Sequence, residues 1–208
     1  MPWINAQCTR EALSPAGFGA TIWAAADAGE ITAEEAPLLV RSLLSAGLDT
    51  TIVDIGNALY AFATNPAQWQ ALREKPALVR PAFDEVLRCE SPIQTFFRTT
   101  TRTVDIGGVE IPQDAKVLLF LASADRDPRR WDEPERFDVN RRAAGHVAFG
   151  AGIHLCVGQM LARLEAEMLV TALAARVERI DIIGEPKRKL SNSLRQFASL
   201  PVELIAAQ

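Results

Sequence analysis

The chain has 208 residues and a net charge of −4 at pH 7, and it is 49% hydrophobic and 23% charged. These proportions are typical of a globular protein with enough apolar side chains for a core. The acidic balance argues against nucleic acid as a partner, because phosphate binding needs a clustered basic surface. No basic leader and no run of about 18 uncharged apolar residues occurs, so we expect neither a signal peptide nor a membrane partner.

The cysteines are Cys8, Cys89 and Cys156, an odd number without a C-x-x-C pair. This usage favours a reducing compartment over a disulfide scaffold, and we therefore expect a cytoplasmic protein.

The first half of the chain has helical patterning. Residues 17–28 predict a short helix, and Thr32-Ala33-Glu34-Glu35 matches a capping box that opens a much longer one. This helix continues to Asn65-Pro66, far beyond the average of about 11–12 residues. Its apolar residues recur at steps of three and four on several sides, so we expect it to run through the middle of a structure.

Shorter elements follow. Helices are predicted from Pro66 to about Pro76 and over 79–89, and residues 95–106 and 116–121 favour strands, with a turn at Gly107-Gly108. Residues 125–145 are charged and interrupted by proline, as in a surface loop. A helix is expected over 159–179 and edge strands over 180–205. The fold class is therefore mainly α with small β-sheets (α+β), in one domain over 1–208.

The strongest chemical signal is the segment from Phe149 to Gly158, in which glycines surround Cys156 just before a helix. Backbone N–H groups and a helix amino terminus near the sulfur favour the thiolate that a metal needs. Glycines also let the loop approach a flat macrocycle closely. The same residues also fit three other interpretations: a small core residue, a zinc site, although paired ligands are lacking, and a dinucleotide loop, although Leu155 replaces its third glycine.

The pattern F-x-x-G-x-H-x-C-x-G resembles the cysteine-ligand loop of cytochromes P450 at every defining position. The resemblance implies the carboxy-terminal half of that fold, with haem b (iron protoporphyrin IX) as cofactor and Cys156 as the thiolate ligand to its iron. Phe149, Gly150 and Gly158 then belong to the haem-binding loop. His154, and Arg98 in Phe96-Phe97-Arg98-Thr99, match contacts to the haem propionates.

On the long helix, Ala46-Gly47-Leu48-Asp49-Thr50-Thr51 resembles the oxygen-activation motif of the same family. Ala46 and Gly47 would leave room above the iron for dioxygen. Asp49 and Thr50 would guide protons, and the Thr50 hydroxyl is expected to bond to a carbonyl one turn earlier and loosen the helix.

The pair Glu85 and Arg88 resembles the E-x-x-R motif of the family, and Arg136 resembles its later arginine. Together the three would form a buried charge network that fixes the cysteine loop. Taken alone, the pair is an ordinary helix-surface ion pair worth a few tenths of a kcal/mol.

The resemblance also implies partners. Parts of the chain are similar to a bacterial subfamily that oxidises para-substituted benzoic acids, which implies a small aromatic carboxylic acid as substrate. The corresponding contacts are Arg41, Ser42, Ser45 and Phe96. An iron–sulfur ferredoxin would supply electrons, and Arg163 is a candidate for docking it.

Two departures from the family pattern stand out. Asp125 replaces an asparagine that bacterial members usually carry, with little effect expected. Family members are also much longer, so the resemblance implies that the half amino-terminal to the central helix is absent, through an internal start or a truncated gene. Two other hypotheses therefore stay open: a haem-binding, non-catalytic remnant and an inert fragment.

Overall fold

A computed structural model describes residues 2–207. They form two compact units that divide between Ile52 and Val53, inside the long helix α3 (Glu35–Thr64). Among the described residues, no helix is both long and apolar enough to cross a membrane.

The first unit contains α1 (Pro2–Ala6), the 3-10 helix η1 (Arg10–Ala12), α2 (Phe18–Asp27) and the first part of α3. The predicted capping box is present: the Thr32 N–H donates to Glu35 Oε2 at 2.8 Å, and the Glu35 N–H donates to Thr32 Oγ1 at 3.2 Å. Large apolar side chains on this part of α3 are exposed, contrary to the expectation that the helix is enclosed along its length. They are Leu38, Leu39, Leu43, Leu44, Leu48 and Ile52.

The second unit contains the rest of α3 and four further α-helices. These are α4 (Pro66–Glu74), α5 (Val79–Glu90), α6 (Leu121–Ala124) and α7 (Gln159–Arg176), and the 3-10 helix η2 (Pro76–Leu78) precedes α5. Its core includes three aromatic rings: Phe62 lies 5.2 Å from Trp69 and 5.9 Å from Phe137, between ring centroids. The Trp69 indole N–H donates to the Glu178 carbonyl, which ties α4 to the strand that follows α7.

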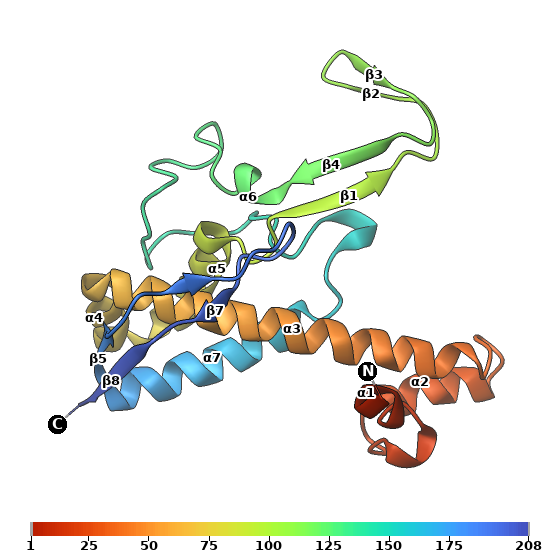
Figure 1. Ribbon diagram of the computed structural model, residues 1–208, viewed down its shortest axis with the longest axis horizontal. Helices are drawn as coiled ribbons and strands as arrows, with labels where there is room; N and C mark the ends of the chain where they lie inside the picture. Colours follow the sequence, from red (N-terminus) through yellow and green to blue (C-terminus); the bar gives the residue numbers. More distant parts are fainter. Residues whose placement is uncertain (1, 208) are drawn as a thin grey trace. The chain divides into compact units, whose positions relative to one another are not determined.

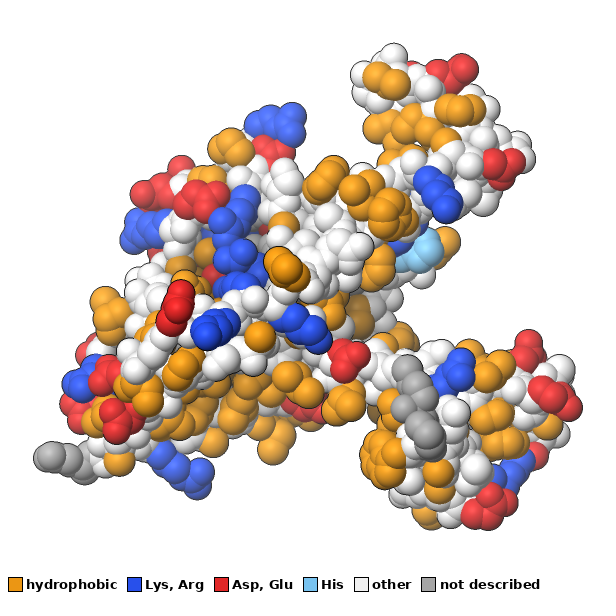
Figure 2. Space-filling view, in the orientation of Figure 1, with side chains coloured by type: hydrophobic (Ala, Val, Ile, Leu, Met, Phe, Trp, Pro, Cys, Tyr) orange, Lys and Arg blue, Asp and Glu red, His pale blue; other side chains and the backbone are white. Residues whose placement is uncertain are grey.

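Small antiparallel sheets complete this unit. β1 (Thr95–Thr99) pairs with β4 (Lys116–Phe120), and this ribbon carries the hairpin of β2 (Val104–Ile106) and β3 (Val109–Ile111) at its far end (Figure 1). Both turn glycines, Gly107 and Gly108, have positive φ. Figure 2 shows hydrophobic side chains along the ribbon and the hairpin.

The carboxy-terminal segment forms β5 (Val177–Ile182) with β8 (Val202–Ala206) and β6 (Lys187–Arg188) with β7 (Phe197–Ser199). The turn between β6 and β7 lies against the approach to β1, where the Gln94 N–H donates to the Ser193 carbonyl at 2.7 Å. The predicted mainly helical fold with small sheets is confirmed. α7 ends at Arg176, earlier than predicted, because Val177 is extended and begins a strand.

Candidate haem-thiolate site

The segment around Cys156 is a loop closed by its own backbone. The Cys156 N–H donates to the Phe149 carbonyl at 2.8 Å, and the Leu155 N–H donates to the Gly152 carbonyl at 3.0 Å within the 3-10 turn η3 (Gly152–His154). Gly150 has φ of 73°, and a Cβ added there would lie 2.8 Å from the His154 carbonyl oxygen. The loop therefore needs a residue without a side chain at position 150.

The Cys156 thiol is free and exposed, just before α7, whose N-cap is Gly158. Apolar side chains on either side of it are also exposed, with Ile153 at 97% and Val157 at 83%. No group of three or more His, Cys, Asp or Glu side chains within residues 2–207 is arranged to hold a metal ion. An accessible thiol in an apolar loop fits a macrocycle that brings its own ring nitrogens to the iron and takes one protein ligand. The donor set thus fits haem better than it fits zinc.

A buried charge network connects α5 to the segment that precedes this loop. The Arg88 guanidinium donates to both Glu85 carboxylate oxygens at 2.7 and 2.9 Å, and neither side chain has solvent exposure. Arg88 also donates to the carbonyls of Asp125 and Pro134. Burial by itself lowers the pKa of Arg88, but the hydrogen bond and charge of Glu85 outweigh it and raise the pKa overall. The guanidinium therefore stays charged and ties α5 to the loop after α6.

The third member of the network differs from the one expected. Arg141 donates from Nε to Glu85 Oε1 at 3.1 Å, with 14% of its side chain exposed. Arg136 instead has a 56% exposed side chain that pairs with Glu133, and it contributes to the network through its carbonyl, which accepts from Arg88 at 3.2 Å. Arg141 carries no distinguishing sequence signal, because it is one of several arginines in an irregular loop.

The candidate propionate contacts lie apart in the chain. Arg98, on β1, donates to the Phe97 carbonyl at 2.8 Å and stacks 5.4 Å from the Phe96 ring centroid. An open hollow of about 290 Å³ beside it is lined by Phe97, Arg98, Thr99 and Lys116. His154, in the cysteine loop, is exposed.

The oxygen-motif residues lie on the part of α3 that belongs to the first unit. The Thr50 hydroxyl donates to the Ala46 carbonyl at 2.7 Å, as expected. The helix nevertheless runs without interruption from Glu35 to Thr64, so the expected loosening is not seen. Asp49 is exposed, and a Cβ added at Gly47 would have no neighbour within 4 Å among residues 2–207.

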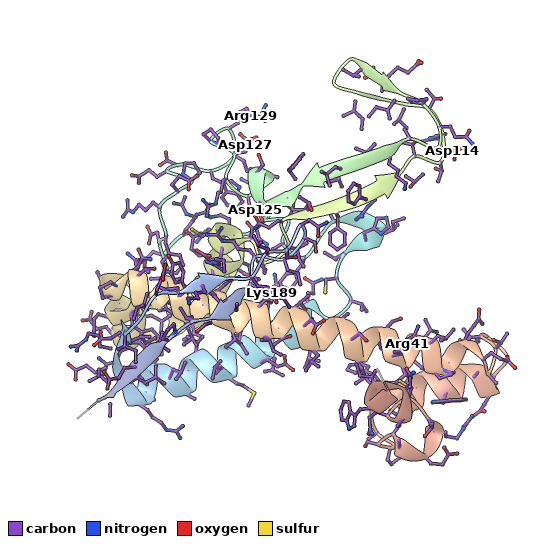
Figure 3. The ribbon with its side chains drawn as sticks, viewed as in Figure 1. Arg41, Asp114, Asp125, Asp127, Arg129 and Lys189 are labelled. Carbon is purple, nitrogen blue, oxygen red and sulfur yellow. The ribbon has the colours of Figure 1, made fainter. Side chains whose placement is uncertain are left out.

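The candidate substrate residues occupy two elements. Arg41 is exposed on the amino-terminal part of α3 (Figure 3), and Ser45 lies half-buried one turn further. The Ser42 hydroxyl donates to the Leu38 carbonyl at 2.9 Å. Phe96, on β1, is exposed.

Two buried carboxyl groups whose pKa values are raised were not among the predicted site residues. Asp125, which follows α6 (Figure 3), accepts the Val147 N–H at 2.8 Å through Oδ1, while its buried Oδ2 has no partner among the described residues. Burial raises the pKa of Asp125 to about 6 and that of Asp54, on α3, to about 7. The aspartate at position 125 therefore has a raised pKa that an asparagine there would not have, whereas little effect of this replacement was expected from the sequence.

Arg163 does not present the free cation expected for docking an electron donor. Its side chain is 17% exposed, its Nε donates to Asp84 Oδ1 at 3.1 Å, and its guanidinium stacks 4.5 Å from the Phe149 ring centroid. It faces the interior between α5 and the cysteine loop.

Comparisons with known proteins identify the family of the chain. The family model for cytochrome P450 matches residues 20–201. The chain is 56% identical over 205 residues to cytochrome P450 CYP199A2 of Rhodopseudomonas palustris, covering 99% of this chain and 50% of that protein. It is 40% identical to cytochrome P450 107B1 of Saccharopolyspora erythraea, covering 88% of this chain and 46% of that protein.

Solved structures give the same result. The chain matches the tirandamycin C-bound P450 monooxygenase TamI with a TM-score of 0.89 and 35% identity, covering 98% of this chain and 52% of that one. It thus spans about half the length of the relatives that it matches. The cysteine loop, the E-x-x-R pair and these matches together place the chain in the cytochrome P450 family.

Proposed function

We propose that this chain forms the haem-binding half of a haem-dependent monooxygenase that hydroxylates or O-demethylates a small aromatic carboxylic acid. The observation that carries the proposal is the exposed Cys156 thiol in a closed glycine loop at the start of α7. Haem b, when bound, supplies an iron that activates dioxygen, and a thiolate ligand favours cleavage of the O–O bond.

Each of the loop residues would have its own role in holding the cofactor. Cys156 would provide the sulfur ligand, and Phe149 keeps the loop closed through its carbonyl. Gly150 allows the left-handed turn of the loop, and Gly158 leaves the space beside the sulfur open, since a Cβ at Gly158 would lie 3.9 Å from it. His154 and Arg98 would bind the propionates as a hydrogen-bond donor and a cation.

Thr50 and Asp49 would handle protons. The Thr50 hydroxyl directs its hydrogen to the Ala46 carbonyl, so its oxygen is free to accept a hydrogen bond from a water molecule. The exposed Asp49 carboxylate can exchange protons with solvent and pass them along through water. Ala46 and Gly47 add almost no side-chain bulk beside them.

For the substrate, Arg41 is the cation that would pair with a carboxylate. The Ser42 hydroxyl donates its hydrogen bond to the Leu38 carbonyl, so of the two serines Ser45 is better placed to donate to a ligand. Phe96 offers an exposed aromatic face for the ring. Dioxygen and an iron–sulfur ferredoxin complete the proposed set of partners, and a cytoplasmic location, consistent with three free cysteines, is part of the same proposal.

The test of the ligand assignment is spectroscopic. The chain is reconstituted with haem, reduced and exposed to carbon monoxide, which should give the strongly red-shifted Soret band of thiolate ligation. Cys156→Ser should abolish this band, and Cys8→Ser, which changes a buried thiol, should keep it. Loss of the band in Cys8→Ser and not in Cys156→Ser would contradict the assignment.

We further propose that the chain by itself does not turn over substrate. Oxidation needs a pocket that holds the substrate and excludes water, and the chain spans about half the length of its relatives. The assay supplies haem, a ferredoxin, its reductase and 4-methoxybenzoate. Turnover of about one per second or more would contradict this proposal. Haem binding without turnover would fit a non-catalytic haem protein, and absence of both would fit an inert fragment.

A further inference from the structure

Three polar side chains form a cluster next to Phe149, the first residue of the cysteine loop. Asp84 on α5 accepts two hydrogen bonds through Oδ1, one from Arg163 Nε on α7 at 3.1 Å and one from His146 Nε2 at 3.4 Å. All three are largely buried, His146 most of all, with 4% of its side chain exposed. Arg163 also donates to Gln159 Oε1 at 2.9 Å, in the first turn of α7.

The hydrogen-bond directions in this cluster are determined by the backbone. His146 Nδ1 accepts the Ala148 N–H at 3.2 Å, so the ring carries its hydrogen on Nε2 and donates it to Asp84. Burial by itself raises the pKa of Asp84, but the His146 hydrogen bond and the Arg163 charge outweigh burial and lower the pKa overall. Asp84 is therefore an anion that anchors both neighbours.

Both neighbours contact the Phe149 ring. The Arg163 guanidinium lies 4.5 Å from its centroid, and the His146 ring lies 5.7 Å away at an angle of 49°. The same ring packs against the buried side chains of Phe83, Leu87 and Ala166. Phe149 in turn accepts the Cys156 N–H, so a continuous series of contacts leads from Asp84 to the proposed ligand.

From this geometry we propose that Asp84 is a positioning residue for the cysteine ligand, acting through Arg163 and His146 on Phe149. The inference rests on the proposed function of Cys156 for its relevance to haem. The effect on loop order, however, is a property of the chain without haem. Asp84 would restrain Phe149, and Phe149 would restrain the backbone of Cys156.

A second ion pair between the same helices provides a matched control. Arg80 Nε on α5 lies 3.4 Å from Glu167 Oε1 on α7, and both side chains are more exposed than Asp84 and Arg163. Glu167→Gln therefore removes an ion pair between α5 and α7 without touching the Phe149 contacts. If Asp84 merely joined two helices, its removal would act in the same way as this control.

The experiment measures backbone hydrogen exchange in the full chain without haem, comparing the Cys156 amide with amides of β5 and β8. Asp84→Asn should speed exchange at Cys156 roughly tenfold, because a partly buried charge-assisted interaction is lost. Exchange in β5 and β8 should change little. Glu167→Gln should leave Cys156 exchange unchanged, and Asp84→Glu, which keeps the carboxylate, should restore protection.

Two results would overturn the inference: unchanged exchange at Cys156 in Asp84→Asn, or an increase no greater than that in Glu167→Gln. If Asp84→Asn unfolds the chain, amides of β5 and β8 will exchange as fast as the Cys156 amide. In that case Arg163→Gln is the variant that tests the inference. That variant keeps the Asp84–His146 bond, and it should still loosen Cys156 selectively; a uniform effect would count against the proposal.

A spectroscopic readout separates this inference from the proposed function. In chain that takes up haem, Asp84→Asn should reduce the fraction showing the red-shifted carbon monoxide band, while Glu167→Gln should not. Survival of that band in Cys156→Ser would refute the ligand assignment and leave the exchange result standing. A normal exchange profile in Asp84→Asn would refute the positioning role and leave the ligand assignment standing.

Discussion

The backbone N–H of Cys156 donates a 2.8 Å hydrogen bond to the carbonyl of Phe149. This bond closes the loop on itself, and it requires the chain to turn through left-handed conformations at Gly150 and Gly152. The two glycines differ in their surroundings, because only Gly150 faces a backbone oxygen at close range. The loop backbone therefore fixes the position of the sulfur, and Gly150 is the residue where that backbone leaves the least room for a side chain.

Gly150→Ala should destabilise the chain by roughly 1–3 kcal/mol, since a Cβ would meet the His154 carbonyl at 2.8 Å in addition to the strained φ. Gly152→Ala should cost only about 1 kcal/mol, because its φ is also positive but no described residue would lie within 4 Å of the added Cβ. Urea unfolding followed by circular dichroism measures both. Equal losses in the two variants would show that the His154 contact does not constrain the loop.

Arg141→Ala should destabilise the chain by about 2–4 kcal/mol, because it removes one partner of the fully buried Glu85. Arg136→Ala should change stability by less than about 0.5 kcal/mol, since its side chain is mostly exposed and the carbonyl that Arg88 uses remains. The same urea titration compares them. A larger loss of stability in Arg136→Ala than in Arg141→Ala would show that Arg136 completes the network, as the sequence predicts.

Asp125→Asn should alter how stability depends on pH. The folded-state pKa of about 6 lies above the ordinary value of 3.8, so the folded chain binds the proton more tightly than the unfolded chain. The stability from this group is present below about pH 4 and is lost as pH rises through 6. The variant should therefore gain stability relative to the native chain between pH 4 and 8, by at most about 3 kcal/mol.

The measurement for Asp125 is the difference in unfolding free energy between native chain and variant at pH 4.5, 6 and 8. Taking the difference cancels the contributions of other titrating groups, including Asp54, whose pKa is also raised. A difference that stays constant across this range would show that the Asp125 carboxyl is not desolvated as the structure indicates.

In a chain extended to the length of its relatives, Thr50→Ala should uncouple electron consumption from product formation and release peroxide, with haem binding intact. Thr64→Ala is a matched control, because the Thr64 hydroxyl makes the same type of bond, to the Tyr60 carbonyl at 2.7 Å, elsewhere on α3. Product formed per NADH consumed is compared in both. Equal coupling in Thr50→Ala and Thr64→Ala would remove Thr50 from the proton relay.

Sequence signals that act over a few residues were sufficient to predict much of the fold. The Thr32–Glu35 capping box, Pro66 at the start of α4 and the Gly107-Gly108 turn all have the predicted geometry. Each depends on interactions within one turn of the chain, which neighbouring residues alone determine. The end of α7 was misplaced because pairing of β5 with β8, a contact between distant segments, competes with helix continuation.

By itself the sequence determined the family, the closed loop at Cys156 and the pairing of Glu85 with Arg88, because each resides in a short motif. Only the tertiary structure decided which arginine completes the network, that Arg163 faces Asp84, and that Asp125 is buried. The first and third outcomes depend on how the irregular segment after α6 folds against α5, and the second depends on how α5 packs against α7. Partners there lie tens of residues apart, and side-chain type carries no information on which pairs meet.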